Sequence, residues 1–260
     1  MLHAAGAVRQ HERHRPARPA LLPSSPESNR DQHRRDSCGP ARGCGMTVRT
    51  DGPSHRAFMV FVRAVVAGDA GAAARLLAAS PELATAGAEE GATRRGAQAY
   101  FLHEIGHYLY GGDTALHVAA AGYRQEIAQR LIAAGADVRA RNRRGAEPLH
   151  YAADGSPGSR VWDPDAQAAT IACLIAAGAD PNAVDNSGVA PLHRAVRTRC
   201  AAAVKALLEH GADVCRANRN GSTPLQLARR NTGRGGSGSP EAKAQQGEIV
   251  RLLAQHGASR

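Results

Sequence analysis

The stretch GDTALHVAA at residues 112–120 recurs three more times along the chain, as GAEPLHYAA at 145–153, GVAPLHRAV at 188–196 and GSTPLQLAR at 221–229. Gly112 and Gly145 are 33 residues apart, as are Gly188 and Gly221, whereas Gly145 and Gly188 are 43 apart. Each copy is followed by an apolar run of helical spacing that ends in Gly-Ala. A period of this length indicates a row of stacked two-helix units.

The residue types inside each copy predict a turn followed by a helix. Thr114 and Thr223 precede the helical stretches, where a hydroxyl can accept a hydrogen bond from a backbone N–H that has no partner within the helix. Three copies then place Pro at the first helical position, where its missing N–H costs nothing. The units close at glycines 135, 178, 211 and 257, which suit a left-handed helix end.

The pattern resembles the ankyrin repeat family, through the Thr-Pro-Leu-His-x-Ala signature and the 33-residue period. Single copies depart from the signature at Ala115, Glu147, Ala190 and Gln226. The resemblance implies an all-α solenoid of about five helix-turn-helix repeats, at approximately 57–80, 111–142, 144–185, 187–218 and 220–258. It also implies that the recurring His117, His150 and His193 serve structure, by bonding to the backbone of the neighbouring turn.

The two ends and the irregular spacings define the domain organisation. Residues 1–45 carry eight arginines, four acids and little hydrophobic periodicity, so we expect a disordered or spurious N-terminal extension before a repeat domain at 46–260. Phe58 to Ala79 reads as two helices around Gly68-Asp69, which form a first repeat without the signature. Insertions are expected at 154–164 and 232–243, each between the helices of one repeat, with the last helix at 247–255.

A third insertion, before Gly112, contains the motif His103-Glu104-Ile105-Gly106-His107. In the H-E-x-x-H pattern of zinc metallopeptidases, the two histidines bind the metal from one helix. Glycines interrupt and follow the motif here, so we expect a β-hairpin-like finger near 99–110, with a zinc peptidase as an alternative. The aromatic residues of the finger either anchor a partner or pack back on the first repeat.

Composition narrows the class of protein. The net charge is +10, and all but two of the 33 basic residues are arginine, which is typical of a G+C-rich coding sequence. A basic nucleic-acid-binding adaptor is therefore an alternative, although no aromatic residues alternate with the basic ones as a stacking platform requires. Five cysteines without a CxxC pair favour a reducing, cytoplasmic location. We expect no membrane span, no cofactor, no metal and a monomer.

Our leading interpretation is a non-enzymatic module that binds a protein partner through its concave face and turn tips, as the resemblance implies. The arginines of that face favour an acidic partner. The expected partner-binding residues are Tyr100, Phe101, Tyr108 and Tyr110 in the finger, Arg143, Arg144, Asn186 and Arg219 at the turn tips, and Tyr151, Asp154, Arg194, Arg197, Leu227 and Arg230 on the first helices.

Overall fold

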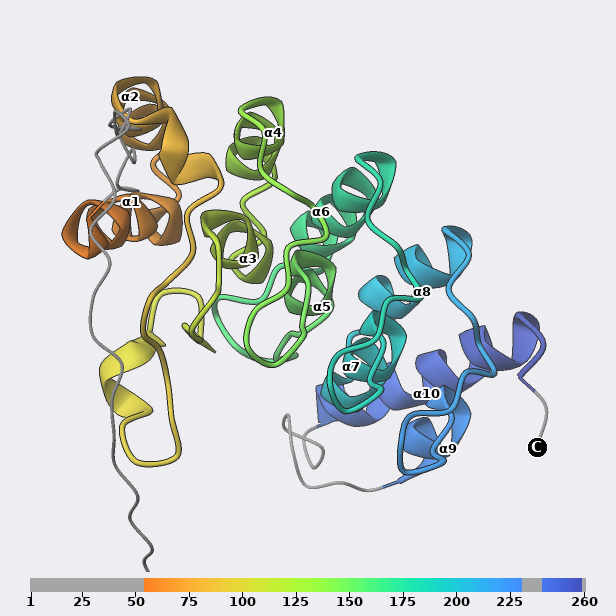
Figure 1. Ribbon diagram of the computed structural model, residues 1–260. Coiled ribbons are helices and arrows are strands. Elements are labelled where there is room, and N and C mark those ends of the chain that lie inside the picture. Colours follow the sequence, from red (N-terminus) through yellow and green to blue (C-terminus); the bar gives the residue numbers. More distant parts are fainter. Residues whose placement is uncertain (1–53, 231–239, 259–260) are drawn as a thin grey trace, which may run out of the picture. The chain divides into compact units, whose positions relative to one another are not determined.

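The computed structural model describes residues 54–230 and 240–258 (Figure 1). All of these belong to one compact unit, Arg49–Arg260. The N-terminal extension expected at 1–45 lies outside the described residues.

The described residues form five consecutive pairs of α-helices, as the repeat spacing predicts. The first pair consists of two helices on either side of Gly68-Asp69, which confirms the prediction for this segment. The pairs are α1 (His55–Ala67) with α2 (Ala70–Ala79), α3 (Ala115–Ala121) with α4 (Gln125–Ala133), α5 (Pro148–Ala152) with α6 (Pro164–Ala176), α7 (Pro191–Thr198) with α8 (Ala201–Glu209), and α9 (Pro224–Arg229) with α10 (Pro240–Gln255). Two short 3-10 helices lie at Pro81–Ala84 and Gln98–Tyr100.

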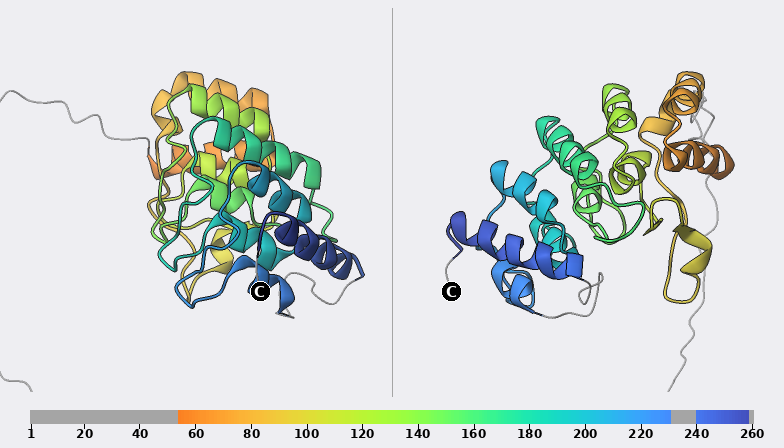
Figure 2. Two further views of the ribbon diagram at one scale, coloured as in Figure 1. Left: turned by 90° about the vertical axis from the view of Figure 1, so that its right-hand side faces the viewer. Right: turned by 180° about the vertical axis from the view of Figure 1, so that it is seen from behind.

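Helices of successive pairs pack side by side in two rows (Figures 1 and 2). The first helices of the pairs contact one another in the order α1, α3, α5, α7 and α9, and the second helices do so in the order α2, α4, α6, α8 and α10. Small aliphatic side chains fill the space between them, and Leu149 and Leu192 are 0% and 1% exposed. Each pair therefore buries its apolar face only against its neighbours, as in other repeat proteins.

The recurring histidines link each turn to the next repeat. His117 Nδ1 accepts a hydrogen bond from the Thr114 backbone N–H, and its Nε2 lies 3.1 Å from the Ala146 carbonyl of the following repeat. Because Nδ1 accepts, Nε2 must carry the proton and the ring must be neutral. His150 and His193 reach the Val189 and Ser222 carbonyls in the same way. The structural role predicted for these histidines is confirmed.

Burial lowers the pKa of all three rings, because a buried imidazole is penalised when it carries charge. For His150 the pKa falls to about 4. The fourth copy has Gln226 at the equivalent position, and its Oε1 accepts from the Thr223 backbone N–H at 3.1 Å. An amide therefore substitutes for the imidazole there.

The closing glycines have positive φ angles, as predicted from their positions. Gly145, at the start of a turn, also has φ +70°, and a Cβ atom there would collide with the Asn186 side chain of the next turn. The left-handed backbone therefore favours glycine at this position, and a larger residue would also displace the Asn186 side chain.

The insertion before α3 ends in the predicted hairpin. Strands β1 (Phe101–Leu102) and β2 (His107–Tyr108) pair antiparallel, with Phe101 opposite Tyr108. The hairpin does not simply project, as we expected of a finger, because Ile105 in its turn and Leu109 after β2 are buried in the common core. Apolar residues in the turn are more stable when they pack against the repeats than when they are exposed to water.

The other two insertions differ in how well they were predicted. Residues 154–163 connect α5 to α6, in the predicted place. The last helix was predicted to begin at Gly247, but α10 begins at Pro240. Proline is tolerated in the first helical turn, and the Glu, Ala, Lys and Gln that follow favour helix strongly enough to carry Gly247 in the interior. Most of the insertion expected at 232–243 lies outside the described residues.

Candidate functional site

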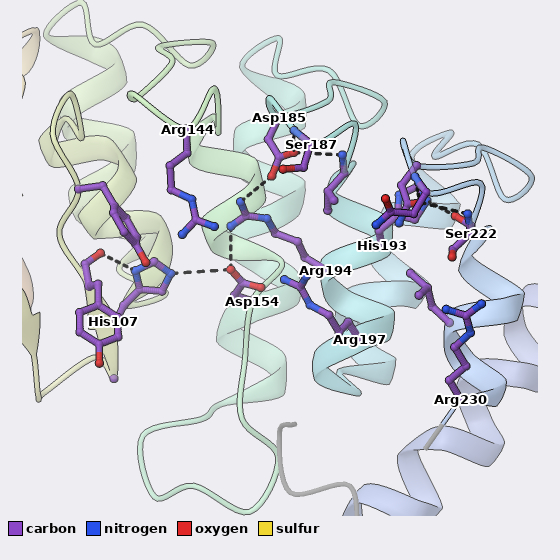
Figure 3. Close-up of a pocket in the computed structure, with 17 residues that line it drawn as sticks. His107, Arg144, Asp154, Asp185, Ser187, His193, Arg194, Arg197, Ser222 and Arg230 are labelled. Carbon is purple, nitrogen blue, oxygen red and sulfur yellow. Dashed lines mark hydrogen bonds and ion pairs between the residues drawn. The ribbon is translucent and has the colours of Figure 1, made fainter. Parts of the chain in front are cut away.

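A pocket of about 560 Å³ opens between the hairpin and the ends of the inner helices α5, α7 and α9 (Figure 3). We call the surface around it, formed by β2, these helix ends and the adjoining turns, the inner-helix face. Eight of the fourteen expected partner-binding residues line the pocket, although they come from four different repeat or insertion segments. They are Tyr108, Tyr110, Arg144, Asp154, Arg194, Arg197, Leu227 and Arg230.

Arg194 holds the centre of the pocket. Its guanidinium donates to Asp154 Oδ2 at 2.9 Å and to Asp185 Oδ2 at 3.1 Å, and its side chain is only 8% exposed. Burial would raise the pKa of both aspartates, but the Arg194 guanidinium helps to hold both pKa values below the ordinary one. Burial alone would also lower the Arg194 pKa, and the two carboxylates raise it instead.

His107 connects the hairpin to the same cluster. Its Nε2 lies 3.7 Å from Asp154 Oδ2, and its ring centroid lies 4.3 Å from that of Tyr151. The Tyr123 hydroxyl donates to the Asp154 backbone carbonyl at 2.6 Å. Asp154 is therefore held through both its side chain and its backbone. The hairpin and the α5–α6 connection, two insertions far apart in the sequence, therefore meet at Asp154.

Three other arginines of the pocket differ from Arg194. Arg144 and Arg230 are exposed and Arg197 is partly exposed. Within the part of the chain that the structure describes, none of the three has a carboxylate within ion-pair distance. Arg144 instead stacks over the Tyr110 ring, with its guanidinium carbon 4.8 Å from the ring centroid. These side chains can bind an anion without first breaking an internal salt bridge.

Tyr151 is a further expected contact that the structure places in the core, with only 2% of its surface exposed. Its hydroxyl lies 2.8 Å from both the Asp113 carboxylate and the Asn142 side-chain amide. Burial and the nearby Asp113 raise its pKa. Tyr151 can therefore support the face from below but offers little surface to a partner.

The remaining expected residues lie outside the pocket. Tyr100 and Arg143 line a second cavity of about 530 Å³ beside the loop before the hairpin. Phe101 packs on the Tyr108 ring at 4.7 Å. Asn186 and Arg219 are exposed at successive turn tips, where the Asn186 side chain donates to the Arg143 carbonyl at 3.2 Å. The turn tips thus form a neighbouring row of surface residues.

Two residues of the charged cluster, Asp185 and His107, were not among the expected partner contacts. Asp185 had a detectable signal, because the equivalent turn positions of the neighbouring repeats hold Asn142 and Asn218. A carboxylate replaces the amide only in the repeat whose inner helix carries Arg194. His107 had no such signal, since its place depends on how the hairpin folds back.

The H-E-x-x-H segment forms the turn and second strand of the hairpin, which confirms the hairpin interpretation. His103 and Glu104 are exposed in the turn, whereas His107 points towards Tyr151 and Asp154. Among the described residues, no cluster of three or more His, Cys, Asp and Glu side chains could hold a metal ion. The motif therefore lacks the helical geometry that zinc peptidases require.

Comparison with known proteins agrees with this architecture. A family model described as ankyrin repeats, in three copies, matches residues 64–159 and 165–260. No curated protein matches the chain significantly. Within the described ranges, every helix is too short or too polar to cross a membrane.

Proposed function

The chain belongs to the ankyrin repeat family, whose members are generally protein–protein interaction modules, and from this premise we propose that it binds a protein partner on its inner-helix face. The observation that carries the proposal is the pocket, where half-buried tyrosines and Leu227 adjoin three arginines that form no ion pair with any described residue. Aromatic residues and arginine are the side chains most enriched at the energetic centres of protein interfaces.

The charge of the pocket supports an acidic partner. Its four arginines outnumber its two aspartates, which leaves a net charge of +2 with the histidines neutral. A partner that brings carboxylates is drawn to this surface and held by charge-assisted hydrogen bonds.

We further propose that the chain acts without catalysis and in the cytoplasm. Members of the family are typically non-enzymatic. Cys173, Cys200 and Cys215 are free thiols, and burial raises the pKa of Cys200 to about 12, so that this thiol is unreactive. Free cysteines are usual in a reducing compartment.

A steric test separates the inner-helix face from the rest of the surface. Ser187 and Asn220 are exposed on the pocket rim, and among the described residues they form hydrogen bonds through backbone groups, their N–H groups and the Ser187 carbonyl. We expect Ser187→Trp with Asn220→Trp to abolish retention of a protein that the full chain captures from an extract of its source cells. The matched control is Ala133→Trp with Ala176→Trp, at exposed and equivalent positions of α4 and α6.

The control variant should retain the partner as the unmodified chain does. Equal retention by the pocket-rim variant, with its folding confirmed by circular dichroism, would show that the partner binds elsewhere on the chain.

A further inference from the structure

We propose that Arg197 and Arg230 form a recognition pair that reads two carboxylates on one extended acidic segment of the partner. This inference rests on the proposed function and specifies the chemistry of the segment. It follows from the repeat register, the internal charge balance of the pocket and the spacing of adjacent repeats.

The repeat register places these arginines at the same position of successive repeats. Arg197 and Arg230 are 33 residues apart, each six residues after the proline that begins its inner helix. The same position is Asp154 in the preceding repeat and Ala121 before that. Along the inner-helix face, this row therefore changes from neutral to acidic and then to two consecutive basic positions.

The acidic member of the row is neutralised inside the molecule. Asp154 Oδ2 accepts from Arg194 at 2.9 Å and also lies near His107. Asp185 is likewise occupied by Arg194. Arg194 forms the ion pairs with both carboxylates, whereas Arg197 acts on Asp154 only through its charge, from beyond ion-pair distance. In Figure 3, Arg197 lies beside Arg194 and Arg230 lies farther along the pocket, away from His107.

The distance between repeats sets the spacing of the carboxylates. Arg197 lies in the last turn of α7, and Arg230 directly follows α9 in extended backbone. Packed helices lie about 8–10 Å apart, so we expect the two residues to be separated by about that distance. In a polyproline II segment, three residues make one turn and advance about 9 Å, which returns the side chain to the same face. A segment with the pattern acid-x-x-acid in this conformation thus places one carboxylate at each arginine.

The rest of the row adds selectivity. A third acid, three residues farther towards the hairpin, would meet the region of Asp154, which already carries a carboxylate. Like charges brought together disfavour binding. The half-buried Leu227, three residues before Arg230, provides apolar surface in the same pocket. The preferred segment therefore carries two acids in this register and a neutral residue at the third position.

A library of random twelve-residue peptides displayed on phage tests the pair directly. It is selected on the full chain, on Arg197→Gln with Arg230→Gln, and on the control Arg63→Gln with Arg229→Gln. Arg63 and Arg229 are exposed, line no part of the pocket and form no ion pair among the described residues. Both variants lose the same formal charge, so the general electrostatic attraction for acidic peptides is weakened equally in both.

We expect the unmodified chain and the control to enrich acid-x-x-acid peptides, and the Arg197/Arg230 variant not to do so. In titration calorimetry at about 0.15 M salt, a selected peptide should bind about tenfold more weakly to each single variant, Arg197→Gln or Arg230→Gln. Moving one acid by a single residue in that peptide should have a similar effect.

Two results overturn the inference. One is enrichment without acids in this register on the unmodified chain. The other is equal affinity of the selected peptide for the unmodified chain and the Arg197/Arg230 variant. Neither result affects the proposed function, which depends on the uncharged tryptophan block at Ser187 and Asn220 and fails only when that block leaves partner capture intact.

Discussion

Mild acid should destabilise the fold through the buried histidines, and the replacement His150→Gln should remove one defined part of that effect. His150 is fully buried, and its two ring nitrogens bond to Glu147 N–H and to the Val189 carbonyl. The replacement is conservative, because the chain itself has Gln226 at the equivalent position of the last repeat.

The sign follows from the direction of the pKa shift. Burial lowers the folded-state pKa of His150 to about 4, below its ordinary value of 6.5. Between these pH values the unfolded chain binds more protons than the folded chain. The contribution of His150 to stability is therefore complete above about pH 6.5 and is lost as the pH falls towards 4. For these two pKa values, the loss between about pH 7.5 and pH 5 is about 2 kcal/mol of unfolding free energy.

Urea denaturation followed by circular dichroism at the two pH values measures the effect. The unmodified chain should lose more than about 2 kcal/mol, because His117 and His193 shift in the same direction, and His150→Gln should lose about 2 kcal/mol less. The control His55→Gln, at an exposed histidine, should keep the full loss. An undiminished loss in His150→Gln would mean that this ring is protonated in the folded chain, and the structural role of the histidines would be refuted.

Four further outcomes are expected. Leu149→Ala or Leu192→Ala should each lower the unfolding free energy by about 2–5 kcal/mol in urea denaturation. The control Val60→Ala, at an exposed site, should change it by less than about 0.5 kcal/mol. Equal effects of the core and control variants would contradict the stacked core. Arg194→Gln should cost about 3 kcal/mol, because it leaves two aspartates without their cation, and a neutral result would show that Arg194 is not structural. Metal analysis of the purified chain should find no stoichiometric zinc, and zinc that is lost on His103→Ala would support the zinc peptidase instead. The chain should not retain nucleic acid at about 0.15 M salt, and retention would support the nucleic-acid-binding adaptor instead.

The repeated segments were predictable because their information is local. A turn glycine, a proline at the first helical position and a histidine two residues before an alanine identify the inner helices of the last four repeats without knowledge of their neighbours, with Ala115 and Gln226 as single departures. The hairpin was also predictable, since β-prone residues flank Glu104-Ile105-Gly106. The structural use of His117 followed from its place in the repeat.

The sequence did not predict which arginines form internal ion pairs and which do not. Arg194 and Arg197 are three residues apart on one helix, yet only Arg194 is neutralised, by carboxylates 40 and 9 residues away in the chain. Whether Asp154 reaches Arg194 depends on how the α5–α6 connection and the hairpin pack together. The burial of Tyr151 likewise depends on Asp113 and Asn142 from the preceding repeat. The repeat register marks Asp185 as unusual, but it does not identify the partners in these long-range contacts.

Hydrogen–deuterium exchange of the full chain, with and without an acid-x-x-acid peptide, tests the central claim most directly. The account predicts added protection of backbone amides in β2, at the end of α7 and in α9, with none in the outer helices α4, α6 and α8. Protection confined to the outer helices, or to the loop beside Tyr100, would contradict the assignment of the inner-helix face as the binding surface.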